Sequence, residues 1–235
     1  MTDTKQENGA TFSRDGGAAS PVHQGDAGRG LTWPTAGRFK TYLAYSLVID
    51  VVFFTVYGGM NWFTAFYADP SKIYFDWELS IPFVPSMFLV YESIFLLFLV
   101  PLFQLNRREL PGLGKQVLAC TVVAGLVYLI FPGELGFQRD GEAGAFTAVF
   151  ELLYALDRPH NVVPSLHVVY SALIVLALSD VATPGLRSLY LIWLGLITVS
   201  VVLVHQHHLA DVAGSYALVW ICRRFMPMRP ALASS

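Results

Sequence analysis

The sequence predicts an all-α, polytopic membrane protein: a bundle of six transmembrane helices with short interfacial helices on its outer face. Three observations lead to this prediction. First, the chain of 235 residues is 54% hydrophobic and only 14% charged, with a mean hydropathy of +0.52, whereas a soluble domain usually carries about 25% charged residues. Second, its apolar residues gather into six long runs. Third, cations cluster in alternate connections between those runs.

The six apolar runs define the membrane domain. A helix needs about 20 mainly apolar residues to cross a bilayer, and each run approaches that length. They cover residues 41–57, 83–105, 116–131, 164–179, 188–204 and 208–222. The third, fourth and sixth runs are short, so their boundaries are the least defined. We expect one six-span domain over residues 39–225.

The two ends of the chain differ from this domain. Residues 1–38 are rich in Gly, Ser, Ala and polar groups. Such a segment buries too little apolar surface to offset the entropy of ordering, which predicts a disordered cytoplasmic tail. It lacks the basic-then-apolar layout of a signal peptide. Residues 226–235 are expected to form a second, short cytoplasmic tail.

Loop charges predict the orientation. The cation-rich connections precede span one, join spans two to three and four to five, and follow span six. They contain Arg38, Lys40, Arg107, Arg108, Lys115, Arg187, Arg223, Arg224 and Arg229. The positive-inside rule makes these connections cytoplasmic, together with both termini, and turns the other three outward. We therefore expect an integral protein of the plasma (inner) membrane. The net charge of −2 argues against a nucleic-acid partner.

Two outward connections are expected to have structure of their own. Residues 59–82 are rich in aromatic side chains suited to the membrane interface. FTAVFELLYAL, at residues 146–156, has the pattern of a short amphipathic helix near the membrane surface. Either segment could guide a lipid or simply anchor the protein at the interface.

Polar residues interrupt the fourth run at its outer end, in the sequence PSLH. Proline favours the first turn of a helix, so the helix is expected to start near Pro164. The first-turn N–H groups of Ser165, Leu166 and His167 then lack intrahelical partners and form a candidate phosphate site. Ser165 adds a hydroxyl donor and His167 a source of protons. The alternative is that His167 only anchors the helix at the interface.

The sixth run opens with HQHHLAD, residues 205–211. On a helix, Asp211 reaches back to His207 at i−4 or to His208 at i−3, and spacing alone does not choose between them. A carboxylate on one ring nitrogen fixes the tautomer and makes the other nitrogen more basic, as in an activated nucleophile. The alternative is a buried polar pair without catalytic function. Spans four and six both run inward, so His167 and His207 are expected at the same membrane depth.

The three histidines and the aspartate also offer enough ligands for zinc. His205 and His207, however, are two residues apart and would diverge on a helix. We therefore expect no metal site.

The two histidine motifs together resemble those of the type 2 phosphatidic acid phosphatase superfamily. They are NVVPSLH, residues 161–167, and SVVLVHQHHLADVAG, residues 200–214. IPFVPSMFLVYES, residues 81–93, is similar to the branch that contains the inositol phosphorylceramide synthases, the targets of aureobasidin A. The resemblance covers residues 39–222.

This resemblance implies a membrane lipid phosphatase or phosphotransferase that works at the outer face without a cofactor or metal. His207 would attack the phosphorus and form a phosphohistidine, and Asp211 would orient His207. His167 would protonate the departing oxygen and then act as base toward the acceptor. Ser165 and backbone amides would hold the phosphoryl oxygens. The substrate would be a membrane lipid phosphate, and the acceptor water, a lipid or a polyol such as inositol.

The chain departs from the family pattern at two cations. Val201 stands where the superfamily has an arginine after its serine, here Ser200. Glu151 stands at the lysine position that precedes an Arg-Pro pair, and that pair also lies too close to PSLH. Some cation should neutralise the phosphate. The candidates are Arg158, Arg139 and His205.

Two other classes of function are compatible with the sequence. A non-enzymatic transporter could use Asp50 of span one and Glu92 of span two, both expected to be buried, with the histidines as a proton or ion path. A degenerate superfamily member could bind lipid without turning it over.

Overall fold

The computed structural model describes residues 28–67, 69–139, 143–156 and 161–228. Within these ranges the chain is helical and contains no strand, which confirms the all-α class. The α-helices are α1 (Ala36–Tyr67), α2 (Phe88–Glu92), α3 (Ile94–Gln104), α4 (Leu110–Ile130), α5 (Thr147–Leu156), α6 (Leu166–Ser179), α7 (Pro184–Leu203) and α8 (Leu209–Phe225). Short 3-10 helices are η1 (Asp76–Ser80), η2 (Pro85–Met87) and η3 (Gly144–Phe146).

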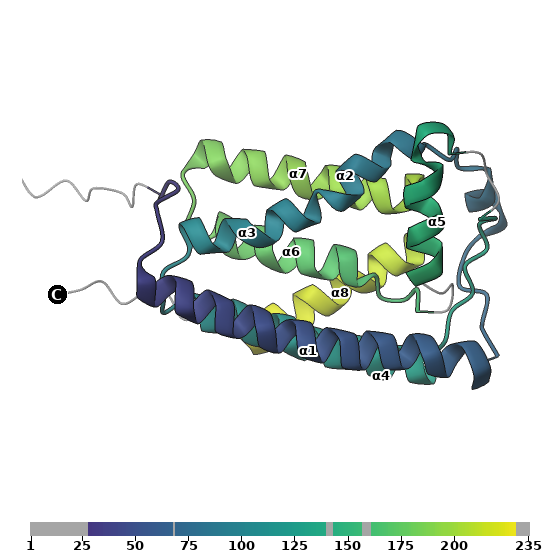
Figure 1. Ribbon diagram of the computed structural model, residues 1–235, viewed down its shortest axis with the longest axis horizontal. Helices are drawn as coiled ribbons and strands as arrows, with labels where there is room; N and C mark the ends of the chain where they lie inside the picture. Colours follow the sequence, from purple (N-terminus) through teal and green to yellow (C-terminus); the bar gives the residue numbers. More distant parts are fainter. Residues whose placement is uncertain (1–27, 68, 140–142, 157–160, 229–235) are drawn as a thin grey trace, which may run out of the picture.

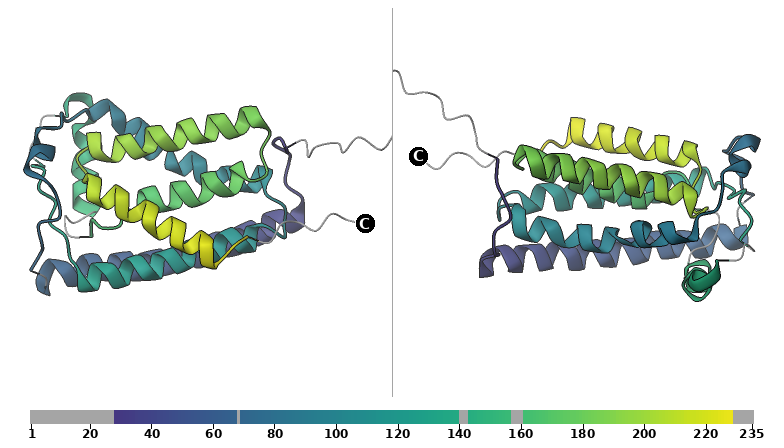
Figure 2. Two further views of the ribbon diagram at one scale, coloured as in Figure 1. Left: turned by 180° about the vertical axis from the view of Figure 1, so that it is seen from behind. Right: turned by 90° about the horizontal axis from the view of Figure 1, so that it is seen from above.

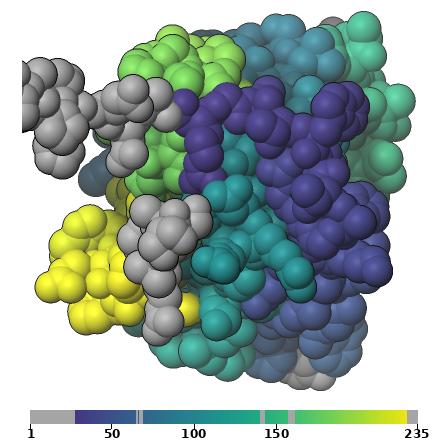
Figure 3. Space-filling model, turned by 90° about the vertical axis from the view of Figure 1, so that its left-hand side faces the viewer, coloured from purple at the N-terminus to yellow at the C-terminus, as the bar shows by residue number. Residues whose placement is uncertain are grey.

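Helices α1, α4, α6, α7 and α8 and the α2–α3 pair run lengthwise, while α5 lies across one end (Figures 1 and 2). We call that end the histidine end, because His167, His205, His207 and His208 lie there. The opposite end, where α1 begins and α8 finishes, is called the arginine end (Figure 3). It carries Arg38, Arg107, Arg187, Arg223 and Arg224.

Four helical stretches are long and apolar enough to cross a membrane. They are Ala36–Thr64, Pro85–Gln104, Leu110–Ile130 and Pro184–Leu203. Their exposed surface is apolar: Leu47, Val51 and Phe54 on α1 are more than half exposed. A surface of this kind is compatible with lipid and unfavourable in water. The fourth and sixth predicted spans are helical too, but with 14 residues in α6 and 17 in α8 they are shorter than the others.

Two glycines bring α4 against α1. A Cβ on Gly114 would lie 2.3 Å from Tyr45, and a Cβ on Gly125 would lie 2.3 Å from Val56. Because eleven residues make about three helical turns, both glycines share one face of α4. Small residues at such a face let two membrane helices approach closely.

Helix α6 forms the centre of the bundle. Twelve of its 14 residues are buried, the pattern of a helix that is apolar on all sides. Its start differs from the expectation that Pro164 occupies the first turn. Ser165 is the N-cap, with extended backbone angles and a side chain that accepts a hydrogen bond from Val168 N–H. A serine cap satisfies one of the unpaired first-turn donors, which is why the helix begins after it.

Residues 28–38, expected to belong to a disordered tail, pack on the arginine end. Arg29 forms a 2.5 Å ion pair with the buried Glu109. The guanidinium of Arg38 is buried and donates to the carbonyls of Thr32 and Trp33. Residues 1–27 of the expected tail lie outside the described part of the chain, as do residues 229–235.

Helix α5 confirms the helix expected at residues 146–156. It also packs against α6 and α7. Phe150 is 2% exposed and packs with Val168 of α6 and Val201 of α7. Helix α5 therefore covers one side of the bundle near the histidine end (Figure 2).

The two membrane carboxylates expected to be buried are not enclosed. Asp50 is exposed on α1, and Glu92 at the end of α2 is half-buried. An exposed Asp50 argues against a proton path through the bundle.

Candidate functional site

His207 and Asp211 form a buried pair at the start of α8. His208 is the N-cap of α8, so His207 lies just before the helix and Asp211 in its first turn. Nδ1 of His207 lies 3.2 Å from Oδ2 of Asp211. Because a carboxylate accepts hydrogen bonds, Nδ1 carries the proton and Nε2 keeps its lone pair. No residue of the described ranges hydrogen-bonds to that Nε2.

His208 is held differently, and this distinguishes the two histidines. The N–H of Gly136 donates to Nε2 of His208 over 3.1 Å, so the proton of the neutral ring is on Nδ1. Nδ1 lies 3.3 Å from Oε2 of the fully buried Glu78. The imidazole is stacked between Tyr74 and Phe137, with ring centroids 4.4 and 4.3 Å away. These contacts cover both faces of the ring and occupy Nε2, while the buried Nδ1 faces Glu78 without forming a hydrogen bond. Both nitrogens of His208 are thus enclosed, in contrast to Nε2 of His207.

Replacing His208 with alanine should therefore lower stability more than chemistry. We expect a loss of about 2–4 kcal/mol in the free energy of unfolding, because a buried ring between two aromatic partners is removed. Any turnover per folded molecule should stay within about ten-fold of that of the parent protein, since both nitrogens of His208 are enclosed. Thermal unfolding in detergent and active-site titration would measure the two effects. A folded variant as inactive as a His207 variant would contradict this assignment.

His167 lies on the first turn of α6, next to α2. Its Nε2 is 2.7 Å from the carbonyl oxygen of Tyr91, and the two rings are stacked 3.9 Å apart. A carbonyl can only accept, so Nε2 carries a proton and Nδ1 is the nitrogen able to exchange one. The start of α6 also lies against α8, where the hydroxyl of Ser215 bonds to the carbonyl of Ser165. The structure therefore brings the two histidine motifs together, as the sequence predicts.

The close approach of α8 to the start of α6 joins the motifs. Ser215 donates its hydroxyl to the carbonyl of Ser165 over 3.1 Å and to that of Asp211 over 2.6 Å. A Cβ on Gly214 would lie 3.1 Å from Val163, tighter than most contacts in proteins. Gly214, the last residue of the second motif, thus lets the aspartate-bearing turn approach the PSLH segment.

The start of α6 retains the features of an anion site. No described residue accepts a hydrogen bond from the backbone N–H of Leu166 or His167. Ser165 is fully buried, and its Oγ accepts from Val168 N–H at 3.4 Å. A hydroxyl that accepts one hydrogen bond can still donate its own proton. Ser165 therefore caps the helix and can also contribute a donor.

Val201, which stands where the resembled superfamily has an arginine, has a structural role in this chain. The side chain of Val201 is fully buried under α5. Its carbonyl accepts hydrogen bonds from the backbone N–H groups of Gln206 and His207, both at 3.1 Å. Val201 therefore holds the turn before His207 but contributes no charge. Ser200 bonds to the carbonyl of Ile197 within α7.

The three candidate cations differ in where they lie and in what they contact. Arg158 lies outside the described residues. His205 is stacked 4.0 Å from Phe137, and its Nε2 lies 3.0 Å from the carbonyl of Ile81. Burial lowers the pKa of His205, against the opposing effect of that hydrogen bond, so the ring is a poor source of positive charge. Arg139 is 3.4 Å from the amide oxygen of Gln206, the residue before His207.

His205 also has a strained backbone, with a φ of 56°. This left-handed conformation costs a residue other than glycine about 1–2 kcal/mol. Its ring contacts offset that cost and turn the imidazole away from His207. The three histidine side chains thus have different partners. Helical spacing does not separate them as expected, because residues 205–208 lie in the turn between α7 and α8.

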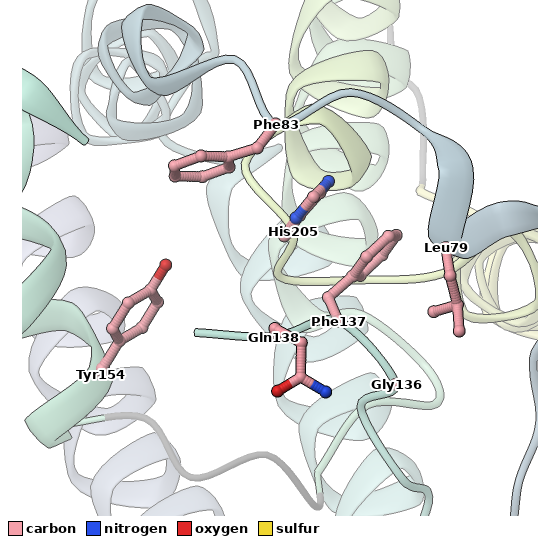
Figure 4. Close-up of a pocket in the computed structure, with 7 residues that line it drawn as sticks. All are labelled: Leu79, Phe83, Gly136, Phe137, Gln138, Tyr154 and His205. Carbon is pink, nitrogen blue, oxygen red and sulfur yellow. The ribbon is translucent and has the colours of Figure 1, made fainter. Parts of the chain in front are cut away.

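A pocket of about 290 Å³ opens beside His205 (Figure 4). Tyr154 of α5 lies across it from Phe137 and His205. The guanidinium of Arg139 stands 4.9 Å from the ring of Tyr154. The pocket is lined by Leu79, Phe83, Gly136, Phe137, Gln138, Tyr154 and His205. It adjoins the His207 turn, but His167, His207 and Asp211 do not line it.

Several residues that hold the site were not singled out by the sequence. Glu78 accepts hydrogen bonds from Phe75 N–H at 3.0 Å and from Leu209 N–H at 2.8 Å, so it fixes the start of α8. In the sequence Glu78 resembles an ordinary acidic loop residue, and Leu209, whose N–H it binds, lies 131 residues further along the chain. Asn161 bonds to Asn61 and Thr64 of α1, and its place in the NVVPSLH motif was the one signal available.

Residues 81–93 contact both histidine motifs. Ile81 bonds to His205, Val84 N–H donates to Leu203 over 2.9 Å, and Tyr91 bonds to His167. The sequence marked this segment by resemblance alone and assigned it no role.

A comparison of the chain with protein-family models, curated proteins and solved structures finds no match.

Proposed function

We propose that the protein is an integral membrane enzyme that transfers or hydrolyses the phosphate group of a lipid through a phosphohistidine on Nε2 of His207. The observation that carries the proposal is the hydrogen bond between Nδ1 of His207 and Asp211. It leaves Nε2 with a lone pair beside an acid–base histidine and a helix N-terminus. The proposal includes membership of the type 2 phosphatidic acid phosphatase superfamily, which rests on the residues of the two motifs.

The reaction would proceed in two steps. His167 enters the first step as the imidazolium, with a proton on each ring nitrogen. Nε2 of His207 attacks the phosphorus, the bond to the leaving oxygen breaks, and that oxygen takes the Nδ1 proton, which leaves His167 neutral. The oxygen of an acceptor hydroxyl then attacks the phosphorus, its proton passes to His167, and the P–N bond breaks. Asp211 stabilises the positive charge that develops on His207 in the first step. Positioning and charge stabilisation of this kind provide most of the catalysis of phosphoryl transfer.

The phosphate would lie between the start of α6 and the His207 turn. The N–H groups of Leu166 and His167 and the positive end of the α6 dipole favour an anion there. Of the described candidate cations, Arg139 is best placed to compensate the charge, because Gln206 and Tyr154 hold its guanidinium.

Replacing Arg139 with glutamine should weaken transition-state binding. We expect kcat/KM for a lipid phosphate to fall about 10- to 100-fold, the usual effect of losing a hydrogen bond to a charged group. Arg139→Lys keeps the charge without the paired donors and should recover part of the activity. Steady-state kinetics in mixed micelles would measure both variants. Equal kcat/KM in Arg139→Gln and the parent enzyme would remove Arg139 from the phosphate site.

The proposed topology has six spans, with the histidine end outside the plasma (inner) membrane and the termini in the cytoplasm. Helix α6 rises only about 21 Å, and Figure 1 shows its start well short of the end of α1. A short central helix is acceptable because protein, not lipid, surrounds it. The phosphate site is then recessed beneath α5.

The acceptor decides between a phosphatase and a transferase. The similarity of residues 81–93 to the inositol phosphorylceramide synthase branch favours transfer of a phospho-headgroup to a lipid or to a polyol such as inositol. Water is the acceptor in the alternative.

One experiment separates these activities. Purified protein is incubated with lipids labelled with ³²P in their phosphate groups, with and without a polyol or lipid acceptor. Free phosphate identifies a phosphatase, and a new labelled lipid or phosphorylated polyol identifies a transferase. Neither product from any lipid phosphate tested, in a protein that binds those lipids, would overturn the proposal.

A further inference from the structure

A second pocket lies near the arginine end, on the side of α8. It has a volume of about 370 Å³. Its lining residues are Leu176, Tyr216, Val219, Trp220, Arg223 and Arg224, and all but Leu176 of α6 belong to α8. Figures 1 and 2 show α8 slanting away from α7 toward this end, so that side of α8 is not covered.

The pocket has two chemically different parts. Leu176, Val219 and Trp220 form an apolar part within the helical segments, and Trp220 is 69% exposed. Arg223 and Arg224 form a cationic part at the last turn of α8. This order, apolar toward the middle of the bundle and positive at its end, matches a lipid acyl chain and an anionic headgroup.

The two arginines are not fully compensated by the protein. Nη2 of Arg223 pairs with Asp180 at 2.6 Å, but its Nη1 is buried and has no hydrogen-bond partner in the described part of the chain. Arg224 is exposed and makes no ion pair with a described residue. Asp180 therefore pairs with one of the two guanidinium groups, and the buried Nη1 of Arg223 lacks an acceptor among the described residues.

We propose that this pocket binds an anionic phospholipid, with its phosphate against Arg223 and Arg224 and one acyl chain along Leu176, Val219 and Trp220. Basic pockets between helices at the cytoplasmic side of membrane proteins bind acidic headgroups in this way. The lining residues of α8 lie about 12 Å (Tyr216) to about 24 Å (Arg224) from His208 along the helix, and none of them belongs to the histidine site. The inference needs the protein to sit in a membrane but does not need it to be an enzyme.

Trp220 provides a local probe. The full-length protein is placed in phosphatidylcholine vesicles, and brominated phosphatidylglycerol or brominated phosphatidylcholine is added as a quencher. The signal of Trp220 is the difference between the parent chain and Trp220→Phe. We expect phosphatidylglycerol to quench Trp220 at a several-fold lower mole fraction than phosphatidylcholine.

Variants test whether the preference for phosphatidylglycerol over phosphatidylcholine comes from the pocket. Arg224→Gln and Arg223→Gln should each lower it about five-fold, the effect of one cation near an acidic headgroup. Asp180→Asn frees Arg223 and should raise it. Arg187→Gln, which removes a cation at the same end but outside the pocket, should leave it unchanged.

Two results would overturn the proposal. One is equal quenching of Trp220 by the two lipids in the parent protein. The other is an equal loss of preference in Arg187→Gln and Arg224→Gln, which would indicate a diffuse surface charge. If Arg223→Gln does not fold, Arg224→Gln and Asp180→Asn still decide the question, because they change the preference in opposite directions. Capture of a protein segment in place of lipid would also leave the two lipids equivalent.

Discussion

Replacing His207 with alanine should lower kcat for lipid phosphate turnover by at least about 1,000-fold, the scale of effect that follows loss of a nucleophile. Nε2 of His207 is the nitrogen on which the phosphohistidine would form, and no other described histidine has a nitrogen in an equivalent position. His208 is enclosed by Glu78, Gly136 and two rings. His167 donates its Nε2 proton to the backbone of Tyr91.

The intermediate can be observed directly. Parent enzyme mixed with a ³²P-labelled lipid phosphate and quenched in alkali should carry a label that alkali preserves and acid removes, as expected of a P–N bond. His207→Ala should carry none, whereas His208→Ala should be labelled in proportion to its folded fraction. Label of normal amount in folded His207→Ala would refute this nucleophile, and turnover without any label in the parent would indicate direct transfer.

Replacing Asp211 with asparagine should reduce kcat by about 100-fold or more, with little loss of stability. Oδ2 of Asp211 accepts from both Nδ1 of His207 and the N–H of His208. The amide oxygen of asparagine can accept the same two hydrogen bonds, so the geometry and the tautomer of His207 are kept. What is lost is the negative charge that stabilises the imidazole as it becomes positive. KM should change little, because Asp211 contacts no substrate.

Asp211→Ala is the matched comparison. It removes the charge and also leaves the buried N–H of His208 without an acceptor, which costs about 1–3 kcal/mol. We expect it to be as inactive as Asp211→Asn and clearly less stable in thermal unfolding. If Asp211→Asn keeps normal kcat while Asp211→Ala only unfolds at lower temperature, then Asp211 has a capping role alone.

The secondary structure could be predicted from the sequence because helix formation depends on residues close together in the chain. All six predicted runs are helical, and the helix expected at residues 146–156 forms α5. Their ends were less predictable. Helix α1 extends to Tyr67, ten residues beyond the expected span, because Asn61 and Thr64 find polar partners at Asn161. The preference of proline for the first turn suggested that α6 starts near Pro164, but Ser165 is the N-cap and the helix begins at Leu166.

The sequence by itself determined that the protein is an all-α chain with apolar helices long enough to cross a membrane, and it placed Asp211 one helical turn after His207 and His208. Apolar content and run length depend on composition, and the i−4 spacing of His207 and Asp211 depends on one turn of chain. Only the tertiary structure decided which histidine Asp211 orients, since Glu78 and Gly136 contact His208 from 130 and 72 residues away. It also decided that Val201 packs under α5 and that Arg139 lies beside the His207 turn. Such contacts join distant parts of the chain, and no local pattern records them.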